Sequence, residues 1–337
     1  MRTQILGQTG IESSHLGFGC VQLTSLCSRR EAHVLLEHAF DQGITHFDVA
    51  RAYGFGRAEG ILSTFLRGKR DRVTVATKLG IQPPSGIAGN RWVIDSAKKL
   101  LAAFPGMQRR VRQRGGAMGR SGVFAPSAAL MSLETSLREL RTDYVDVLFL
   151  HEATVAEASD EALIGMLRQQ VDKGKVRCLG LASDFSKLSS SAESVPEQYR
   201  ILQFNDNAAN RNLERLTHRE QRTIITHSIF QPARVLPEAI ATHPEIASKF
   251  SLKLGLDLSD PTIVGSLLLR YALLSNSDGI VLFSSTDAGR ITTNVRDAEP
   301  DGYQRRLPIF TQFVDEILDA HWRTSRGPNV NRLPDGK

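Results

Sequence analysis

Cysteine is scarce in this chain, and features typical of several other protein classes are missing. The three cysteines among 337 residues are an odd number without the spacing of a metal site. They favour a reducing cytoplasm over a disulfide framework, and they are Cys20, Cys27 and Cys178. No stretch approaches the roughly 20 apolar residues that a membrane span needs, and residues 1–11 lack the basic and apolar segments of a signal peptide. We therefore expect a cytoplasmic protein with no membrane segment and no bound metal.

Acidic residues are fewer than basic ones. The 36 Asp and Glu residues face 42 Lys and Arg residues, which leaves a formal net charge of +6. Much of this excess lies in residues 107–120, where five arginines occur without an acid. A nucleic-acid-binding protein would place its basic residues along a helix face with aromatic residues between them, and neither feature is seen. We interpret the segment as a solvated loop and expect no nucleic-acid partner.

Eight short apolar runs divide the chain, and each is followed by a segment with helical periodicity. Their centres are apolar on both faces, as in parallel strands that are buried on both sides. The predicted strands are residues 14–19, 45–49, 73–78, 144–150, 176–182, 200–205, 223–227 and 279–283. This α/β alternation predicts a closed (β/α)8 TIM barrel, with an open doubly wound sheet as the competitor. The competitor is weakened because no GxGxxG motif follows the first strand.

The predicted barrel occupies most of the chain. We expect residues 1–325 to form a single domain and residues 326–337 to be loose. Residues 2–9 would form one arm of an N-terminal β-hairpin at the barrel's N-terminal end. An amphipathic helix is predicted around residues 307–322. Its apolar side contains Phe310, Phe313, Val314, Ile317 and His321.

Two long segments interrupt the regular spacing of strands and helices. Residues 81–125 follow the third predicted strand, and residues 230–258 follow the seventh. In a barrel, both lie at the C-terminal face, where active sites form. We interpret both as irregular loops that close over the substrate, and we expect part of the first to become ordered when a ligand binds.

Four side chains with acid–base chemistry should meet at that face. Asp48, Lys78 and His151 each end a predicted strand, and Tyr53 follows Asp48 by five residues in a glycine-rich turn. A tyrosine titrates near pH ~10, and the adjacent Lys78 ammonium would lower this pKa by favouring the phenolate. Asp48 would pair with Lys78, and a neutral His151 would donate an N–H to a substrate carbonyl. We therefore assign catalytic roles to all four residues.

Each of these residues has a simpler explanation when it is taken alone. Asp48 could form a turn or cap a helix, and Lys78 could be a solvated strand end. Tyr53 could pack within its turn, and His151 could satisfy a buried backbone group. The occurrence of all four at successive strand ends favours catalysis. His46, two residues before Asp48, should point into the barrel, and we interpret it as structural.

The segments that carry these residues resemble the aldo-keto reductase family. Residues 47–59, Phe-Asp-Val-Ala-Arg-Ala-Tyr-Gly-Phe-Gly-Arg-Ala-Glu, are similar to its signature F-D-T-A-x-x-Y-G-x-x-x-x-E. Residues 75–80 resemble its lysine strand, residues 132–151 the helix and strand that lead to its histidine, and residues 174–180 its fifth strand. These motifs occur in the family's order between about residue 6 and residue 295.

The resemblance implies an enzyme that passes a hydride between NAD(P) and an aldehyde, ketone or alcohol. The family's catalytic tetrad falls on Asp48, Tyr53, Lys78 and His151, with Tyr53 as the proton donor to the carbonyl oxygen. The resemblance favours NADP as the cofactor, with NAD possible, and implies that the cofactor binds before the substrate. The implied cofactor-binding residues are Cys20, Asp48, Ser183, Gln203, His227, Ser228, Ser284, Ser285, Thr286, Arg290 and Asn294.

The resemblance also divides the cofactor among these residues. Ser183 and Gln203 stand where the family holds the carboxamide. His227 would supply the face that stacks on the nicotinamide, where most members have an aromatic ring, although it could also be a plain core histidine. Val21 stands where many members have a tryptophan for substrate stacking.

The adenosine phosphate end would be bound after the eighth strand. Arg290 could stack on the adenine or reach the 2′-phosphate of NADP. Ser284 replaces a lysine that is common in the family, so one favourable charge is missing. Asp287 would either repel the phosphate or cap the following helix and point away from it.

Two other classes of function remain open from the sequence. The first is a barrel that binds the cofactor as a sensor or regulatory subunit and turns over slowly. The second is a lyase in which Lys78 forms a Schiff base with its substrate. The intact tetrad favours the reductase, because Asp48 and Tyr53 would lack a role in the lyase.

Overall fold

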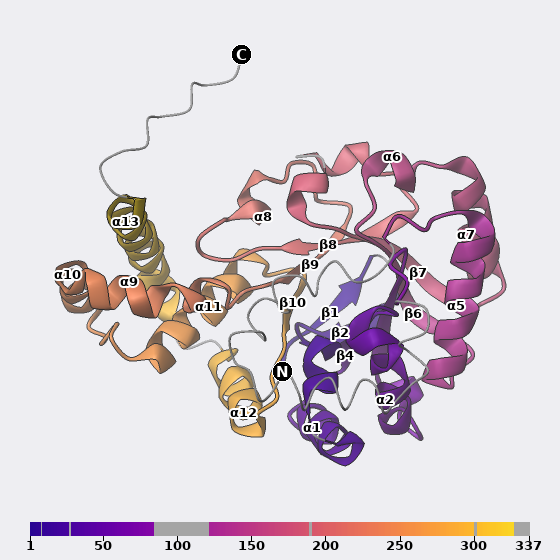
Figure 1. Ribbon diagram of the computed structural model, residues 1–337, viewed down its shortest axis with the longest axis horizontal. Helices are drawn as coiled ribbons and strands as arrows, with labels where there is room; N and C mark the ends of the chain where they lie inside the picture. Colours follow the sequence, from indigo (N-terminus) through magenta and orange to yellow (C-terminus); the bar gives the residue numbers. More distant parts are fainter. Residues whose placement is uncertain (8, 27, 84–120, 189–190, 300–301, 327–337) are drawn as a thin grey trace.

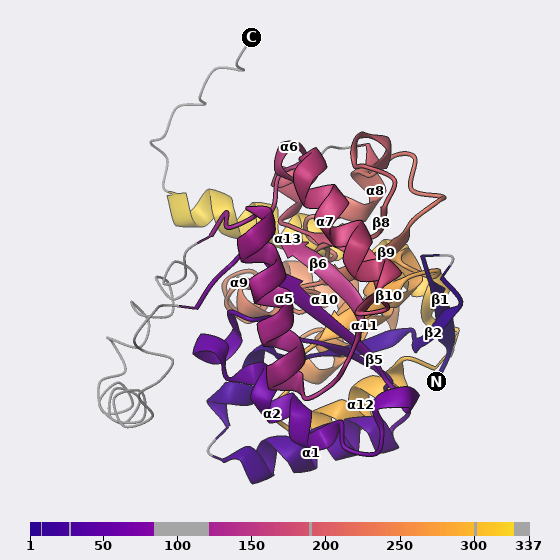
Figure 2. The same ribbon diagram turned by 90° about the vertical axis from the view of Figure 1, so that its right-hand side faces the viewer.

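The computed structural model describes residues 1–7, 9–26, 28–83, 121–188, 191–299 and 302–326. Within these residues, eight parallel strands close into a barrel in the order β10-β3-β4-β5-β6-β7-β8-β9, and the helices lie outside it (Figures 1 and 2). The strands are β3 (Leu16–Gly19), β4 (His46–Asp48), β5 (Thr74–Leu79), β6 (Val145–His151), β7 (Val176–Ala182), β8 (Tyr199–Asn205), β9 (Thr223–His227) and β10 (Ile280–Phe283). The predicted TIM barrel is confirmed, with strand bounds within two residues of those expected.

Helices follow the strands because the connecting segments bury one apolar side against the barrel. In α7, for example, Leu163, Ile164 and Leu167 are buried. The helices around the barrel are α1 (Arg29–Asp41), α2 (Ala58–Phe65), α5 (Pro126–Leu140), α6 (Val155–Ala158), α7 (Glu161–Asp172), α8 (Asn212–Arg215), α11 (Pro261–Ser275) and α12 (Ala288–Asp297). Among the helices described, none is long and apolar enough to cross a membrane.

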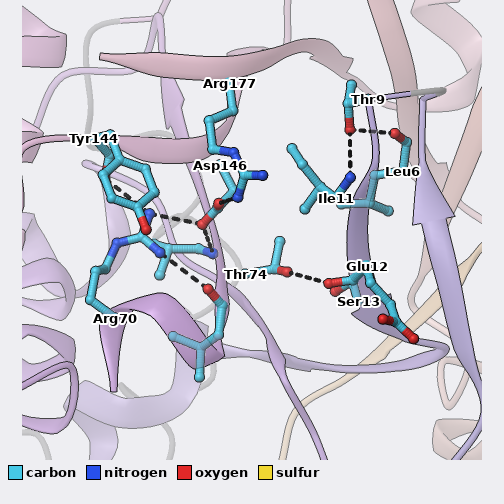
Figure 3. Close-up of polar contacts among 12 residues, drawn as sticks. Leu6, Thr9, Ile11, Glu12, Ser13, Arg70, Thr74, Tyr144, Asp146 and Arg177 are labelled. Carbon is cyan, nitrogen blue, oxygen red and sulfur yellow. Dashed lines mark hydrogen bonds and ion pairs between the residues drawn. The ribbon is translucent and has the colours of Figure 1, made fainter. Parts of the chain in front are cut away.

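An antiparallel hairpin of β1 (Thr3–Leu6) and β2 (Ile11–Ser14) covers the N-terminal end of the barrel. Leu6 and Ile11 are buried in a cluster with residues of the barrel strands, and the Thr74 hydroxyl donates to the Glu12 carbonyl at 3.3 Å (Figure 3). His46 is completely buried beside the hairpin, with Nδ1 3.1 Å from the Ser13 hydroxyl. The predicted hairpin arm and the structural interpretation of His46 are both confirmed.

The prediction of an irregular loop at residues 230–258 is wrong. This segment forms the 3-10 helix η7 (Pro232–Arg234) and the helices α9 (Leu236–Thr242) and α10 (Pro244–Leu254). Their apolar sides pack with α11 and the C-terminal helix α13 (Leu307–Arg326) into a second hydrophobic core. Figure 1 shows α9, α10 and α13 together on one side of the barrel.

The amphipathic helix predicted near the C-terminus is confirmed as α13. Its five predicted inward residues are at most 6% exposed, and they are Phe310, Phe313, Val314, Ile317 and His321. The helix reaches Arg326, one residue into the segment that was expected to be loose. Residues 327–337 lie outside the described residues, as do 84–120 of the other long connection with its arginine-rich part.

A buried carboxylate joins three strands near the N-terminal end of the barrel (Figure 3). Asp146 on β6 is 1% exposed and forms ion pairs with Arg70 at 2.8 Å and with Arg177 at 2.7 Å. The same carboxylate accepts the Val75 N–H of β5 at 2.8 Å. Arg70 also stacks on the Tyr144 ring, with its guanidinium carbon 3.9 Å from the ring centroid. Because the carboxylate is buried, the loss of these contacts is costly.

We expect Asp146→Asn to lower the free energy of unfolding by about 3–5 kcal/mol, because two arginines lose their buried partner. Urea denaturation followed by circular dichroism measures the change. Asp319→Asn is the control, since Asp319 pairs with Arg323 at 3.2 Å on an exposed helix surface and should leave stability nearly unchanged. Equal effects of the two substitutions would contradict a stabilising role for the Asp146 network.

Candidate active site

A cavity of about 510 Å³ opens at the carboxyl ends of the barrel strands. All four predicted catalytic residues line it: Asp48, Tyr53, Lys78 and His151. The carboxyl ends of parallel strands meet at one face of a closed barrel. Residues that end β4, β5 and β6 are therefore neighbours in space although they are up to 103 residues apart in sequence (48 to 151).

Tyr53 reaches the cavity from a tight turn, η2 (Tyr53–Gly56), that follows β4. The backbone turns left-handed at Gly54 (φ 59°) and Phe55 (φ 60°), which is uncommon for a residue such as Phe55. A side chain at Gly54 would place its Cβ 2.0 Å from the Thr24 methyl group, so only glycine allows this close approach. The turn is therefore held in one unusual conformation, with Tyr53 directed to the barrel mouth.

Lys78 and Asp48 form a buried ion pair beneath Tyr53. The Lys78 ammonium donates to both Asp48 carboxylate oxygens at 2.5 Å and to the Val49 carbonyl at 3.3 Å. Both side chains are at most 4% exposed. Burial lowers the pKa of Lys78, and the carboxylate of Asp48 opposes this shift. The predicted pairing of the two residues is confirmed.

The prediction that Lys78 lowers the pKa of Tyr53 is wrong. Burial raises the pKa of Tyr53 well above its ordinary value, and the negative charge of Asp48 adds to the shift. The Lys78 ammonium lies 5.5 Å from the centroid of the Tyr53 ring, but its hydrogen bonds go to Asp48 and to the Val49 carbonyl. Tyr53 therefore keeps its proton at neutral pH, and the raised pKa makes it a weaker acid than a free tyrosine.

His151 is a neutral imidazole, as predicted. Burial, with the nearby charge of Lys78, lowers its pKa to about 3. Its ring meets the Tyr53 ring edge to face, with 6.1 Å between the centroids. A neutral imidazole carries one N–H donor, which can be directed at a substrate oxygen in the same cavity.

Some of the residues that the resemblance assigns to the cofactor lie at this cavity, namely Asp48, Ser183, Gln203, His227, Ser228 and Ser284. The Gln203 amide nitrogen donates to Asp48 at 3.0 Å, whereas its Oε1 is buried with no hydrogen-bond partner in the described part of the chain. Ser183 donates to the Ala153 carbonyl at 2.6 Å. Burial lowers the pKa of His227, which favours a neutral ring at the cavity wall.

The other assigned residues do not line the cavity. Ser285, Thr286, Arg290 and Asn294 lie after β10 and on α12, where Thr286 and Arg290 are exposed. Cys20 is completely buried, its thiol is 3.8 Å from the Phe18 carbonyl, and burial raises its pKa. Their roles as cofactor ligands therefore stay predictions.

Asp287 caps helix α12. Its carboxylate accepts the Arg290 N–H at 3.0 Å, and its own N–H donates to the Ser285 hydroxyl at 3.0 Å. Of the two roles expected for Asp287, the structure shows the cap. The carboxylate is engaged with the backbone of the helix that it begins.

Several cavity residues received no role from the sequence, among them Gln22, Glu152, Gln231 and Arg234. Glu152 directly follows His151, has a left-handed backbone (φ 61°) and pairs with Lys187 at 2.7 Å. Its position directly after the strand-end residue His151 could have predicted that Glu152 lies at the cavity. Gln231 and Arg234 belong to residues 230–258, which the sequence placed over the substrate without singling out these two side chains.

A closed parallel barrel with ionisable groups at its carboxyl end is the architecture of TIM-barrel proteins. The Aldo/keto reductase family model matches residues 15–227, and the chain belongs to this family. An uncharacterized oxidoreductase from Bacillus subtilis is 28% identical over 54% of this chain and 49% of its own length. A 6-dehydroglucose reductase from Agrobacterium fabrum is 30% identical over 54% of this chain and 55% of its own length. The chain thus spans about half the length of these curated relatives.

Solved structures show the same barrel. A glycerol dehydrogenase from Gluconobacter oxydans superposes with a TM-score of 0.69 at 18% identity and covers 99% of both chains. An aldo-keto reductase from Klebsiella pneumoniae, in complex with NADPH, superposes with a TM-score of 0.64 at 17% identity, over 94% of this chain and 96% of that one. At these identities the likeness establishes the fold.

Replacing Lys78 by Met should destabilise the protein by about 3–5 kcal/mol, because Asp48 then keeps a buried charge without its partner. The double variant Lys78→Met with Asp48→Asn should be more stable than Lys78→Met alone, since the second change removes that charge. Urea denaturation of wild type, of the single variants Lys78→Met and Asp48→Asn, and of the double variant measures both effects.

Lys249→Met provides the control, because Lys249 pairs with Glu316 at 2.6 Å on the surface. It should change stability little. A double variant whose loss of stability equals the sum of the two single losses would show that Lys78 and Asp48 do not depend on each other.

Proposed function

We propose that this protein reduces an aldehyde or ketone to an alcohol by hydride transfer from a nicotinamide cofactor, with Tyr53 as the proton donor. The observation that carries the proposal is the convergence of a neutral tyrosine hydroxyl, a buried Lys78–Asp48 pair and a neutral His151 on one cavity. The reductase and dehydrogenase names of the relatives are consistent with it. Membership of the family supports an oxidoreductase that acts on carbonyls or alcohols. The geometry of the cavity supports the roles proposed for the individual residues.

The cavity residues fit a nicotinamide. Gln203 Oε1 is a buried acceptor that needs a donor, and a carboxamide NH₂ would satisfy it. Ser183 lies beside it at the ends of β7 and β8, and the His227 ring supplies an aromatic face. Bound there, the reduced cofactor would supply the hydride.

We propose NADP as the preferred cofactor, with NAD also used. An aldo-keto reductase of the same fold binds NADPH. In this chain the Asp287 carboxylate is engaged as the cap of α12. Arg290 and the hydroxyls of residues 284–286 would hold that phosphate at the start of α12, where backbone N–H groups favour anions.

The protein's own contribution is to bind the carbonyl and move one proton. The His151 N–H would hold the carbonyl oxygen, and Tyr53 Oη would give it a proton as the hydride arrives at carbon. Lys78 and Asp48 would provide fixed, buried charges next to Tyr53.

The rival functions make different predictions for one experiment. Oxidation of NADPH and of NADH is followed with a panel of short aldehydes, sugars, ketosteroids and quinones. A reductase turns over at least one of these carbonyls, whereas a sensor binds the cofactor and oxidises it slowly with all of them. The lyase is disfavoured because Lys78 is an ammonium that bridges both oxygens of Asp48, and borohydride trapping with a carbonyl should yield no adduct.

Tyr53→Phe should lower kcat by roughly 10²–10⁴-fold, because the ring is kept and the proton donor is lost. The dissociation constant of the cofactor, measured by fluorescence titration, should stay unchanged. Tyr144→Phe is the matched control, since Tyr144 stacks on Arg70 away from the cavity. A Tyr53→Phe variant that retained more than about a tenth of the wild-type kcat would contradict the assignment of Tyr53.

The rate of carbonyl reduction should be nearly independent of pH between about 6 and 9. The protonated form of Tyr53 is lost only as pH rises through a pKa that is raised well above the ordinary value of 10.0. The neutral form of His151 is lost only as pH falls towards a pKa of about 3. The measurement is kcat/KM against pH at saturating cofactor, and a decline in rate between pH ~7 and 9 would contradict the prediction that no group needed for the reaction titrates in this range.

A further inference from the structure

Glu59 is a buried carboxylate that the proposed reaction does not use. It is the second residue of α2, directly after the turn that carries Tyr53, and its side chain is completely buried. Burial raises its pKa, while the hydroxyls of Ser136 and Thr77 and the charge of Arg51 act in the opposite direction. Burying a carboxylate lowers the stability of the fold unless the group is paired or hydrogen-bonded.

The contacts of Glu59 connect the two segments that supply the central catalytic residues. Its Oε1 accepts the Thr77 hydroxyl at 2.7 Å, and Thr77 immediately precedes Lys78 on β5. Its Oε2 lies 3.5 Å from Arg51, which comes two residues before Tyr53. One carboxylate therefore joins the strand of Lys78 to the turn of Tyr53 from behind the cavity.

The Tyr53 turn needs such a restraint. Gly54 and Phe55 adopt left-handed backbone conformations, and a non-glycine residue persists in that region only when its surroundings hold it there. Thr24 confines the turn on one side through its close approach to Gly54. The Arg51–Glu59 pair confines it on the other, at the point where the chain leaves β4.

We infer that Glu59 is a positioning residue, which holds Tyr53 in place over Lys78 through Arg51 and Thr77. This inference rests on the proposed function, because it assigns a role in the chemical step. Small displacements of a proton donor are costly for the rate, since about 1 Å can slow a reaction roughly 100-fold. We expect NADPH affinity to depend little on this link, because Glu59 does not line the cavity that holds the predicted nicotinamide ligands Ser183 and Gln203.

The central experiment compares Glu59→Gln with wild type in a single turnover at saturating NADPH and carbonyl substrate. Glutamine keeps the size of the side chain and loses the charge that holds Arg51. We expect the rate of cofactor oxidation to fall roughly 10- to 100-fold, while the dissociation constant of NADPH stays within about 2-fold. A rate equal to that of wild type, or equal losses in rate and in NADPH affinity, would overturn the inference.

Asp146→Asn is the matched control. Asp146 is also a buried carboxylate paired with arginine, but it lies at the start of β6 and contacts residues at the starts of β5 and β7, at the end of the barrel opposite to the cavity. Both variants should lose stability, and only Glu59→Gln should lose single-turnover rate at a temperature where each is folded. A comparable slowing by Asp146→Asn would mean that loss of stability alone explains the Glu59 result.

Thr77 keeps the inference testable if Glu59→Gln fails to fold. Thr77→Val has nearly the same shape but removes the hydroxyl that bonds to Glu59, and Thr77→Ser retains it. We expect Thr77→Val to slow the single turnover and Thr77→Ser to restore most of the rate. Equal rates in the two variants would overturn the role of this contact.

If the proposed function is wrong, the experiments give a result different from the one expected when only the role of Glu59 is wrong. In that case the wild-type protein itself oxidises no cofactor with any carbonyl of the panel. If wild type turns over and Tyr53→Phe does not, while Glu59→Gln and Thr77→Val match wild type, the proposed function stands and only the role of Glu59 is wrong.

Discussion

The buried ion pair between the Lys78 ammonium and the Asp48 carboxylate constrains the rest of the candidate site. Lys78 and Asp48 contact each other at 2.5 Å, and both side chains are at most 4% exposed. Each charge therefore depends on the other, and β4 and β5 must keep the register that brings them together. The pair also acts on its neighbours. The charge of Lys78 helps to lower the pKa of His151, and that of Asp48 helps to raise the pKa of Tyr53.

The barrel uses buried carboxylates at both of its ends. Near the N-terminal end, Asp146 ties β6 to arginines from neighbouring segments and leaves no group facing the cavity. At the C-terminal end, Asp48 and Glu59 hold residues that line the cavity or stand next to it. A rigid scaffold with its chemistry at one end matches the general division of a TIM barrel into a stabilising face and a catalytic face. The same kind of ion pair can thus be tested for stability at one end and for rate at the other.

The second core shows why part of the fold was mispredicted. Residues 230–258, which were expected to be an irregular loop, contain Pro232, Pro237 and Pro244. In the structure each proline occupies the first turn of a helix, where the missing N–H costs nothing and the fixed φ is favourable. The apolar residues between them are buried only because α13, about 60 residues further along the chain, packs against them. Local patterns carry no information about that distant partner.

The sequence by itself determined the eight strands, the hairpin, the C-terminal helix and the four residues expected to meet at the barrel mouth. It could do so because the apolar runs have a strand's length, and because the carboxyl ends of parallel strands share one face. Only the tertiary structure decided how those residues behave. The pKa of Tyr53 rises instead of falling, Asp287 caps a helix, and Cys20 is completely buried. Each of these outcomes depends on burial and on distances of a few ångströms between side chains, which spacing along a chain does not specify.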